Sequence, residues 1–95
     1  MIRNVVVGKL DDGVALDDIT PALDAILALD PPGLVEVHVG TDLRLRAGGF
    51  DFAITNDFED ADAYRAYDLD EEHNRIRQEM FAPLCQQIVR IQFTL

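Results

Sequence analysis

The chain has 95 residues, and 48% of them are hydrophobic, which predicts a single folded domain over residues 1–95 with a modest core. Eighteen acidic residues against eight lysines and arginines give a net charge of −10 at pH 7, which repels phosphate backbones and anionic lipid surfaces. No apolar run approaches the length of a membrane span, so we expect a cytoplasmic protein with no nucleic-acid partner and no membrane partner.

The first half of the chain predicts a strand, a helix and a second strand. Residues Ile2–Leu10 contain a run of β-branched residues, which favours a strand. Between Asp17 and Leu29 the apolar residues follow helical spacing, and the helix starts either at an aspartate cap or with Thr20 as the cap and Pro21 first in the helix. From Leu34 to about Leu45, apolar residues alternate with polar ones, as in a strand with one buried face.

The second half repeats this order of elements. Alternation predicts a strand over Phe50–Phe58, after a glycine-containing hairpin connection. Acidic residues from Glu59 onwards favour the start of a helix, and Pro83 kinks or ends the helical run that follows. Alternating apolar residues over Gln87–Leu95 predict the last strand.

The order of elements, βαβ followed by βαβ, is that of the ferredoxin-like fold in the α+β class. It predicts a four-stranded antiparallel sheet with the helices on one face. Several strands carry apolar residues on both faces, as Val5–Val7 show most plainly. An uncovered apolar sheet invites a second copy, so we expect a homodimer that closes sheet against sheet.

The strongest candidate for chemistry is His73, at the end of the stretch Tyr64–Asn74. A hydrogen bond from Tyr67 could fix the tautomer of its imidazole inside a cavity beneath the helices. Such a histidine could abstract a proton next to a carbonyl, with Tyr67 or Asn4 donating to the developing oxyanion. The alternative is a purely structural His73 that packs against Tyr67.

The remaining polar residues predict no metal and no cofactor. His38 alternates with two valines and has no partner spaced to orient it, so it is either an interface residue or solvated. The acids around Asp57–Asp62 lack the glycine and the distal glutamate of a calcium loop. Consecutive side chains over Asp70–His73 diverge on a helix, which favours a solvated acidic joint. Cys85 is interpreted as a small hydrophobe, because no base or positive charge accompanies it.

Four stretches resemble a known family. They are RNVVVGKL at the start, VEVHVG in the second strand, GGFDFAITNDFEDADAYRAY through the third strand, and EEH leading to APL. Their order and spacing resemble the stress-responsive α/β-barrel domain (Dabb) family over essentially the whole chain. The resemblance implies a ferredoxin-like subunit and a dimeric α+β barrel.

A plant member of that family is a polyketide cyclase, which closes a ring by intramolecular aldol condensation with two histidines. The resemblance places the second of these at His73 and the tyrosine that holds it at Tyr67. The first falls on Asn4, and a further pocket histidine falls on Phe52. The family's frequent His-Pro-x-His run reads Asp-Glu-Glu-His here and begins at Asp70.

We therefore expect a dimeric protein that binds a small hydrophobic or aromatic molecule, such as a carbonyl-bearing one, in a pocket between helices and sheet. Two alternatives remain: a structural stress-response protein without a ligand, and a polyketide-cyclase-like lyase that uses His73. The residues expected to line the pocket are Asn4, Leu23, Ile26, Phe52, Ile54, Tyr67 and His73.

Overall fold

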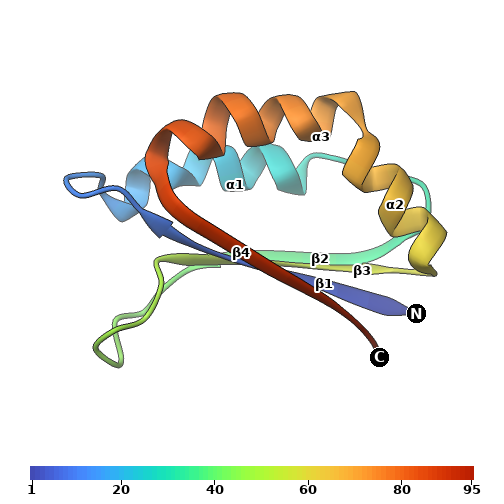
Figure 1. Cartoon of the computed structure of the whole chain (residues 1–95), viewed down its shortest axis with the longest axis horizontal. Helices are drawn as coiled ribbons and strands as arrows, with labels where there is room; N and C mark the ends of the chain where they lie inside the picture. The colour runs from blue at the N-terminus through green and yellow to red at the C-terminus, as the bar shows by residue number, and fades with distance from the viewer.

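Four antiparallel strands form one sheet, and the helices lie together on one of its faces (Figure 1). The computed structural model describes all 95 residues. The strands are β1 (Ile2–Leu10), β2 (Leu34–Thr41), β3 (Phe52–Phe58) and β4 (Cys85–Thr94), and their order in the sheet is β2-β3-β1-β4. This order is the one that two βαβ units produce when they interlock, so the prediction of a ferredoxin-like fold is confirmed.

The helix layer contains α1, α2 and α3, together with two 3₁₀ turns and one π turn. The predicted first helix begins as a 3₁₀ turn, in which Asp18 accepts a hydrogen bond from the Ala15 amide at 2.9 Å. Thr20 is therefore the first α-helical residue rather than the cap, and Pro21 follows it where a missing amide hydrogen is tolerated. None of the helices has both the length and the apolar character needed to cross a membrane. In chain order the elements are the 3₁₀ turn Leu16–Ile19, α1 (Thr20–Leu27), α2 (Ala61–Leu69), α3 (Glu71–Ile76), a π turn (Arg77–Phe81) and a 3₁₀ turn (Ala82–Leu84).

The core lies between the helices and the inner face of the sheet. Side chains alternate across a strand, so the even-numbered residues of β1 and β3 face the helices. Phe58 and Ile19 are fully buried, and Ile76 is nearly so. The main cluster of buried residues consists of Leu10, Ile19, Ala22, Leu23, Ile26, Phe52, Ile54, Ile76 and Phe81.

The second and third strands are shorter than predicted. Pairing between them ends at Thr41 and Phe52, and residues 42–51 form a loop rather than strand ends and a tight hairpin. Asp51 holds this loop to the sheet, because its carboxylate accepts hydrogen bonds from the Leu10 amide at 2.7 Å and from Arg44 at 2.6 Å. The last strand starts at Cys85, two residues earlier than predicted.

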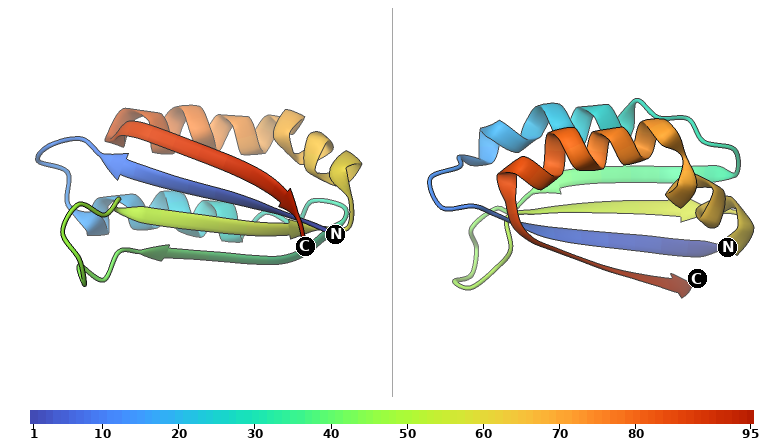
Figure 2. Two further views of the ribbon diagram at one scale, coloured as in Figure 1. Left: turned by 60° about the horizontal axis from the view of Figure 1, so that its bottom comes forward. Right: turned by 45° about the horizontal axis from the view of Figure 1, so that its top comes forward.

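The outer face of the sheet carries no helix, as Figure 2 shows in its left view. Val89, Ile91 and Phe93 of β4 are 41%, 60% and 44% exposed there. In the register of the sheet they lie beside Val7, Val5 and Arg3 of β1, so an apolar patch extends over two strands. Two polar pairs also lie on this face: Arg3 with Asp57 at 2.7 Å, and His38 with Glu36 at 3.0 Å.

Candidate functional site

A cavity of about 180 Å³ lies between the sheet and the segment that runs from α2 through the π turn. Eight of its 15 lining residues are hydrophobic. Three strands and all three helices contribute to it, so the cavity is a product of the whole fold. Its lining consists of Asn4, Val6, Ile54, Asn56, Ile88 and Arg90 from the sheet, and of Ile26, Tyr64, Tyr67, Asp68, His73, Arg77, Gln78, Phe81 and Ala82 from the helix layer.

The joint between α2 and α3 determines where His73 lies. Asp70 has an extended backbone, which ends α2, and its carboxylate accepts a hydrogen bond from the His73 amide at 3.0 Å, which caps α3. The side-chain amide of Asn74 donates to the carbonyls of Asp68 and Asp70, both at 3.0 Å. The acidic stretch from Asp68 to Glu72 therefore ends one helix and caps the next, and the change of direction between them places His73 on the side of the sheet.

The imidazole of His73 is buried, and one of its two nitrogens has no hydrogen-bond partner in the protein. The residue is 8% exposed, and its Nδ1 is fully enclosed without a partner. Burial lowers the pKa of His73, and the positive charge of Arg77 lowers it further, while the nearby carbonyl of Tyr67 acts in the opposite direction. The ring is therefore held neutral, and a neutral imidazole has one donor and one acceptor nitrogen.

The phenol ring of Tyr67 contacts His73 by stacking and not through a hydrogen bond from its hydroxyl. The two rings stack with centroids 4.0 Å apart, and no hydrogen bond joins the phenol to the imidazole, which corrects the predicted Tyr–His pairing. The reason is that the two helix caps bring residue 73 back over residue 67. Burial raises the pKa of Tyr67 to about 12, with the Asn56 side chain opposing the rise, so the hydroxyl keeps its proton.

Asn4 belongs to a chain of amides along the inner face of the sheet. Its Nδ2 donates to Asn56 at 3.0 Å, and its Oδ1 accepts from Gln92 at 2.9 Å. The three side chains come from β1, β3 and β4, where the register places them side by side. One hydrogen of the Asn4 amide and its oxygen are thus used within the protein, which leaves little capacity for donation to a ligand.

Five of the seven residues predicted to line the pocket do so, and two do not. Asn4, Ile26, Ile54, Tyr67 and His73 line the cavity. Leu23 and Phe52 lie in the core instead, where they are 4% and 3% exposed. The ring of Phe52 packs against Phe81, at a centroid distance of 5.6 Å, and this pair closes that end of the space.

Two arginines, Arg77 and Arg90, are the main feature of the lining that the sequence did not suggest. The alternation of β4 carried a usable signal: if its valine, isoleucine and phenylalanine form the outer face, Arg90 must face inward. No comparable signal exists for Arg77, because the π turn that orients it has no simple sequence pattern.

The other candidate groups take no part in the cavity. Burial raises the pKa of Cys85 to about 11, so its thiol is protonated and unreactive at neutral pH. His38 lies on the outer face, paired with Glu36. No three histidines, cysteines or acids lie close enough together to hold a metal ion.

Comparisons with known proteins agree with this architecture. The model of the stress responsive A/B barrel domain (Dabb) family matches residues 2–95. No curated protein matches the sequence. A dimeric ferredoxin-like protein of unknown function from Thermobifida fusca is similar in structure, with a TM-score of 0.86, 31% identity, and coverage of 99% of this chain and 90% of that one.

Two further solved structures resemble the chain in fold. A hydroxynitrile lyase from Passiflora edulis has a TM-score of 0.82 and 22% identity, and the match covers 99% of this chain and 92% of that one. A dimeric ferredoxin-like protein of unknown function from a Jannaschia species has a TM-score of 0.80 and 22% identity, with coverage of 99% and 98%. Because the family model spans nearly every residue, the chain belongs to the stress responsive A/B barrel domain family.

Proposed function

We propose that this protein is a homodimer and that each subunit binds one small, largely apolar molecule in the pocket between helices and sheet. The observation that carries the proposal is the buried imidazole of His73, with its unpartnered Nδ1, in the lining of an apolar cavity. A buried polar group without a partner is costly, by about 1–3 kcal/mol. A ligand with a hydroxyl or carbonyl group would meet this ring from the cavity that His73 lines.

The size of the cavity limits the ligand to about one ring. An apolar cavity of about 150 Å³ accommodates benzene, and the pocket here has about 180 Å³. Its walls include Val6, Ile54 and Ile88 from the sheet and Phe81 from the π turn. A monocyclic molecule, or a short branched chain of equal volume, matches these dimensions.

Binding is proposed rather than turnover because the pocket offers only one group suited to proton transfer. His73 is neutral and could accept a proton, but the position of a second base is occupied by Asn4, which is tied into the amide chain. Tyr67 keeps its proton and stacks on His73. One base without a partner supports recognition better than a reaction cycle.

The outer face of the sheet supports the homodimer. Its apolar patch contains the exposed side chains of Val89, Ile91 and Phe93. A hollow of about 570 Å³ beside it is lined by Val7 and Ala53 and by the exposed Leu43 and Leu45 of the loop. Such a surface is stabilised when a second copy covers it, and similar structures from Thermobifida fusca and Jannaschia are dimeric.

Filling the pocket tests the binding proposal. Ile88 lies on the inner face of an edge strand, so Ile88→Trp places a large ring in the cavity where a strand tolerates it. We expect phenol and benzamide to give saturable amide chemical-shift changes around His73 in NMR titrations of the wild type. These changes should disappear in Ile88→Trp.

Leu69→Trp is the matched control, because Leu69 is 79% exposed on α2 and does not line the pocket. This variant should bind both probes as the wild type does. Absence of saturable shifts in the wild type would instead support a purely structural protein. Equal shifts in Ile88→Trp would place the binding site elsewhere.

A further inference from the structure

The lining of the pocket is more positive than the chain as a whole. Arg77 and Arg90 contribute two positive charges to it, and Asp68 contributes one negative charge. The complete chain has a net charge of −10. Only eight residues of the chain are lysine or arginine, and two of them line this apolar cavity. This placement favours a negatively charged ligand.

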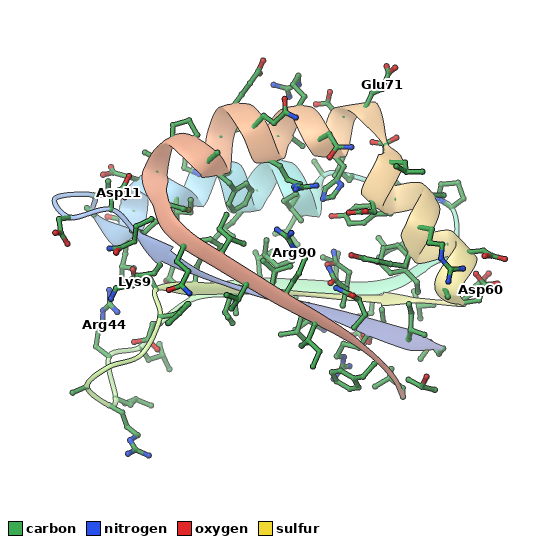
Figure 3. All side chains as sticks on the ribbon, viewed as in Figure 1. Lys9, Asp11, Arg44, Asp60, Glu71 and Arg90 are labelled. Carbon is green, nitrogen blue, oxygen red and sulfur yellow. The ribbon has the colours of Figure 1, made fainter.

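Arg90 is the more informative of the two, because it has no acidic partner. Five other arginines, at positions 3, 44, 65, 75 and 77, each lie within 4.0 Å of a carboxylate. Arg90 forms no ion pair, although acidic residues outnumber basic ones by more than two to one; the other arginine without one, Arg46, is exposed in the loop 42–51 and does not line the pocket. The register places it opposite Val6, on the inner face of β4. Figure 3 shows its side chain pointing from β4 toward the helix layer.

Two further hydrogen-bond donors, Arg77 and Tyr64, line the same cavity as Arg90. Burial raises the pKa of the Tyr64 phenol, and the positive charges of Arg90 and Arg77 oppose that rise. Arg77 donates to Asn74 at 3.0 Å, and its distance to Asp68 is 3.8 Å, too long for a hydrogen bond. Tyr64 forms no side-chain hydrogen bond within the protein.

We propose that the pocket selects a small monocarboxylate: the carboxylate binds Arg90 beside Tyr64 and Arg77, and the apolar body lies against Val6, Ile54 and Ile88. Guanidinium and carboxylate form paired, charge-assisted hydrogen bonds that are about twice as strong as neutral ones. The negative field of the chain disfavours a doubly charged phosphate more than a single carboxylate. The inference rests on the proposed binding function, since it names the class of ligand for that site.

Benzoate and benzamide provide the test, because they have nearly the same shape and differ in charge. We expect the wild type to bind benzoate about tenfold more tightly than benzamide in NMR titrations at low salt. Arg90→Gln should abolish that preference. Arg90→Lys should retain part of it, and added salt should weaken benzoate binding alone.

Arg65→Gln is the control for overall charge, because it removes the same charge from an exposed arginine of α2 that does not line the pocket. It should keep the preference for benzoate. Equal binding of the two probes to the wild type would overturn the inference and leave the proposed function intact. Loss of the preference in Arg65→Gln would also overturn it, and failure of both probes to bind would contradict both proposals.

Discussion

At the scale of single residues, the protonation state of His73 decides what the pocket offers a ligand. The ring is stacked on Tyr67 and enclosed by protein, so a proton on it would add a charge beside Arg77 without a counter-ion at hydrogen-bond distance. The folded protein therefore favours the neutral ring. The same burial makes folding sensitive to acid, because the unfolded chain has no such preference.

We predict that acidification below about pH 6.5 destabilises the protein through His73, since that is the ordinary pKa of an exposed histidine. The folded-state pKa lies lower, so the unfolded state binds the proton first and the free energy of unfolding falls as the pH falls. The loss stops growing below the folded pKa, where both states are protonated. Urea unfolding of the wild type at a series of pH values measures this slope.

His73→Gln should remove this part of the slope, and the exposed His38 remains in both proteins as an internal control. The pKa values of Asp51 and Asp57 are lowered by their hydrogen bonds and ion pairs. Their contribution is therefore lost only at lower pH, below about 4, which is the ordinary range of an aspartate. Identical pH profiles of wild type and variant above that range would contradict the assignment.

At the scale of elements, the sequence was most informative where side chains alternate across a strand. The four strands and the ferredoxin-like order followed from that periodicity. The same periodicity misplaced the end of β2, because Leu43 and Leu45 continue the alternation although they are 79% and 83% exposed. Alternation of apolar residues predicts which face of a strand is buried, but it does not predict where pairing with the neighbouring strand ends.

The candidate site was predictable only in part for the same reason. Side chains alternate between the two faces of a strand, so the sequence predicts that Asn4 and Ile54 point toward the helices. The structure places both in the lining of the pocket. The direction in which a helical side chain points depends on rotation about the helix axis. Leu23 and Ile26 were therefore both predicted to line the pocket, and only Ile26 does. The π turn shifts that rotation after Ile76, and three of its five residues line the pocket.

Close packing between β1 and β3 gives a second prediction. Gly8 lies opposite Phe52, and a methyl group on Gly8 would overlap the Phe52 ring. That ring is 3% exposed and packs against Phe81, so it has little room to move. We expect Gly8→Ala to lower the free energy of unfolding by about 1–3 kcal/mol, as overpacking of a core does. Urea unfolding measures the loss.

Gly40→Ala is the control for this prediction. It adds the same methyl group to a strand glycine of β2, where no atom lies within 4 Å of the new carbon. Its stability should change by less than about 1 kcal/mol, since surface substitutions without a packing conflict are usually small. If the two variants lost equal stability, the contact with the Phe52 ring would not be the cause of the effect.

At the scale of the whole molecule, the two faces of the sheet have separate tasks. The inner face and the helices enclose the pocket, and the outer face is left with Val89, Ile91 and Phe93 exposed beside the valines of β1. The acidic charge of the chain opposes association, so only burial of apolar surface can hold two copies together. A charge introduced into that patch should therefore act on the dimer and not on the pocket.

Ile91→Glu provides this test, because Ile91 is 60% exposed and pairs with Val5 near the middle of the apolar patch. An unpaired carboxylate there loses its hydration on association, and its effect is doubled by symmetry, so the dimer should weaken by about a hundredfold or more. We expect sedimentation at micromolar concentration to show a dimer for the wild type and a monomer for Ile91→Glu.

Leu69→Glu makes the same chemical change on α2, which lies away from the outer face, and it should remain dimeric. Binding of phenol and benzamide should be retained by the monomeric Ile91→Glu, because the pocket lies between the helices and the inner face of the sheet, away from the outer face. A wild type that sediments as a monomer would refute the sheet-to-sheet dimer. A monomer that no longer binds the probes would show instead that the second copy is needed to hold the helices over the pocket, which would couple the two faces through the strands they share.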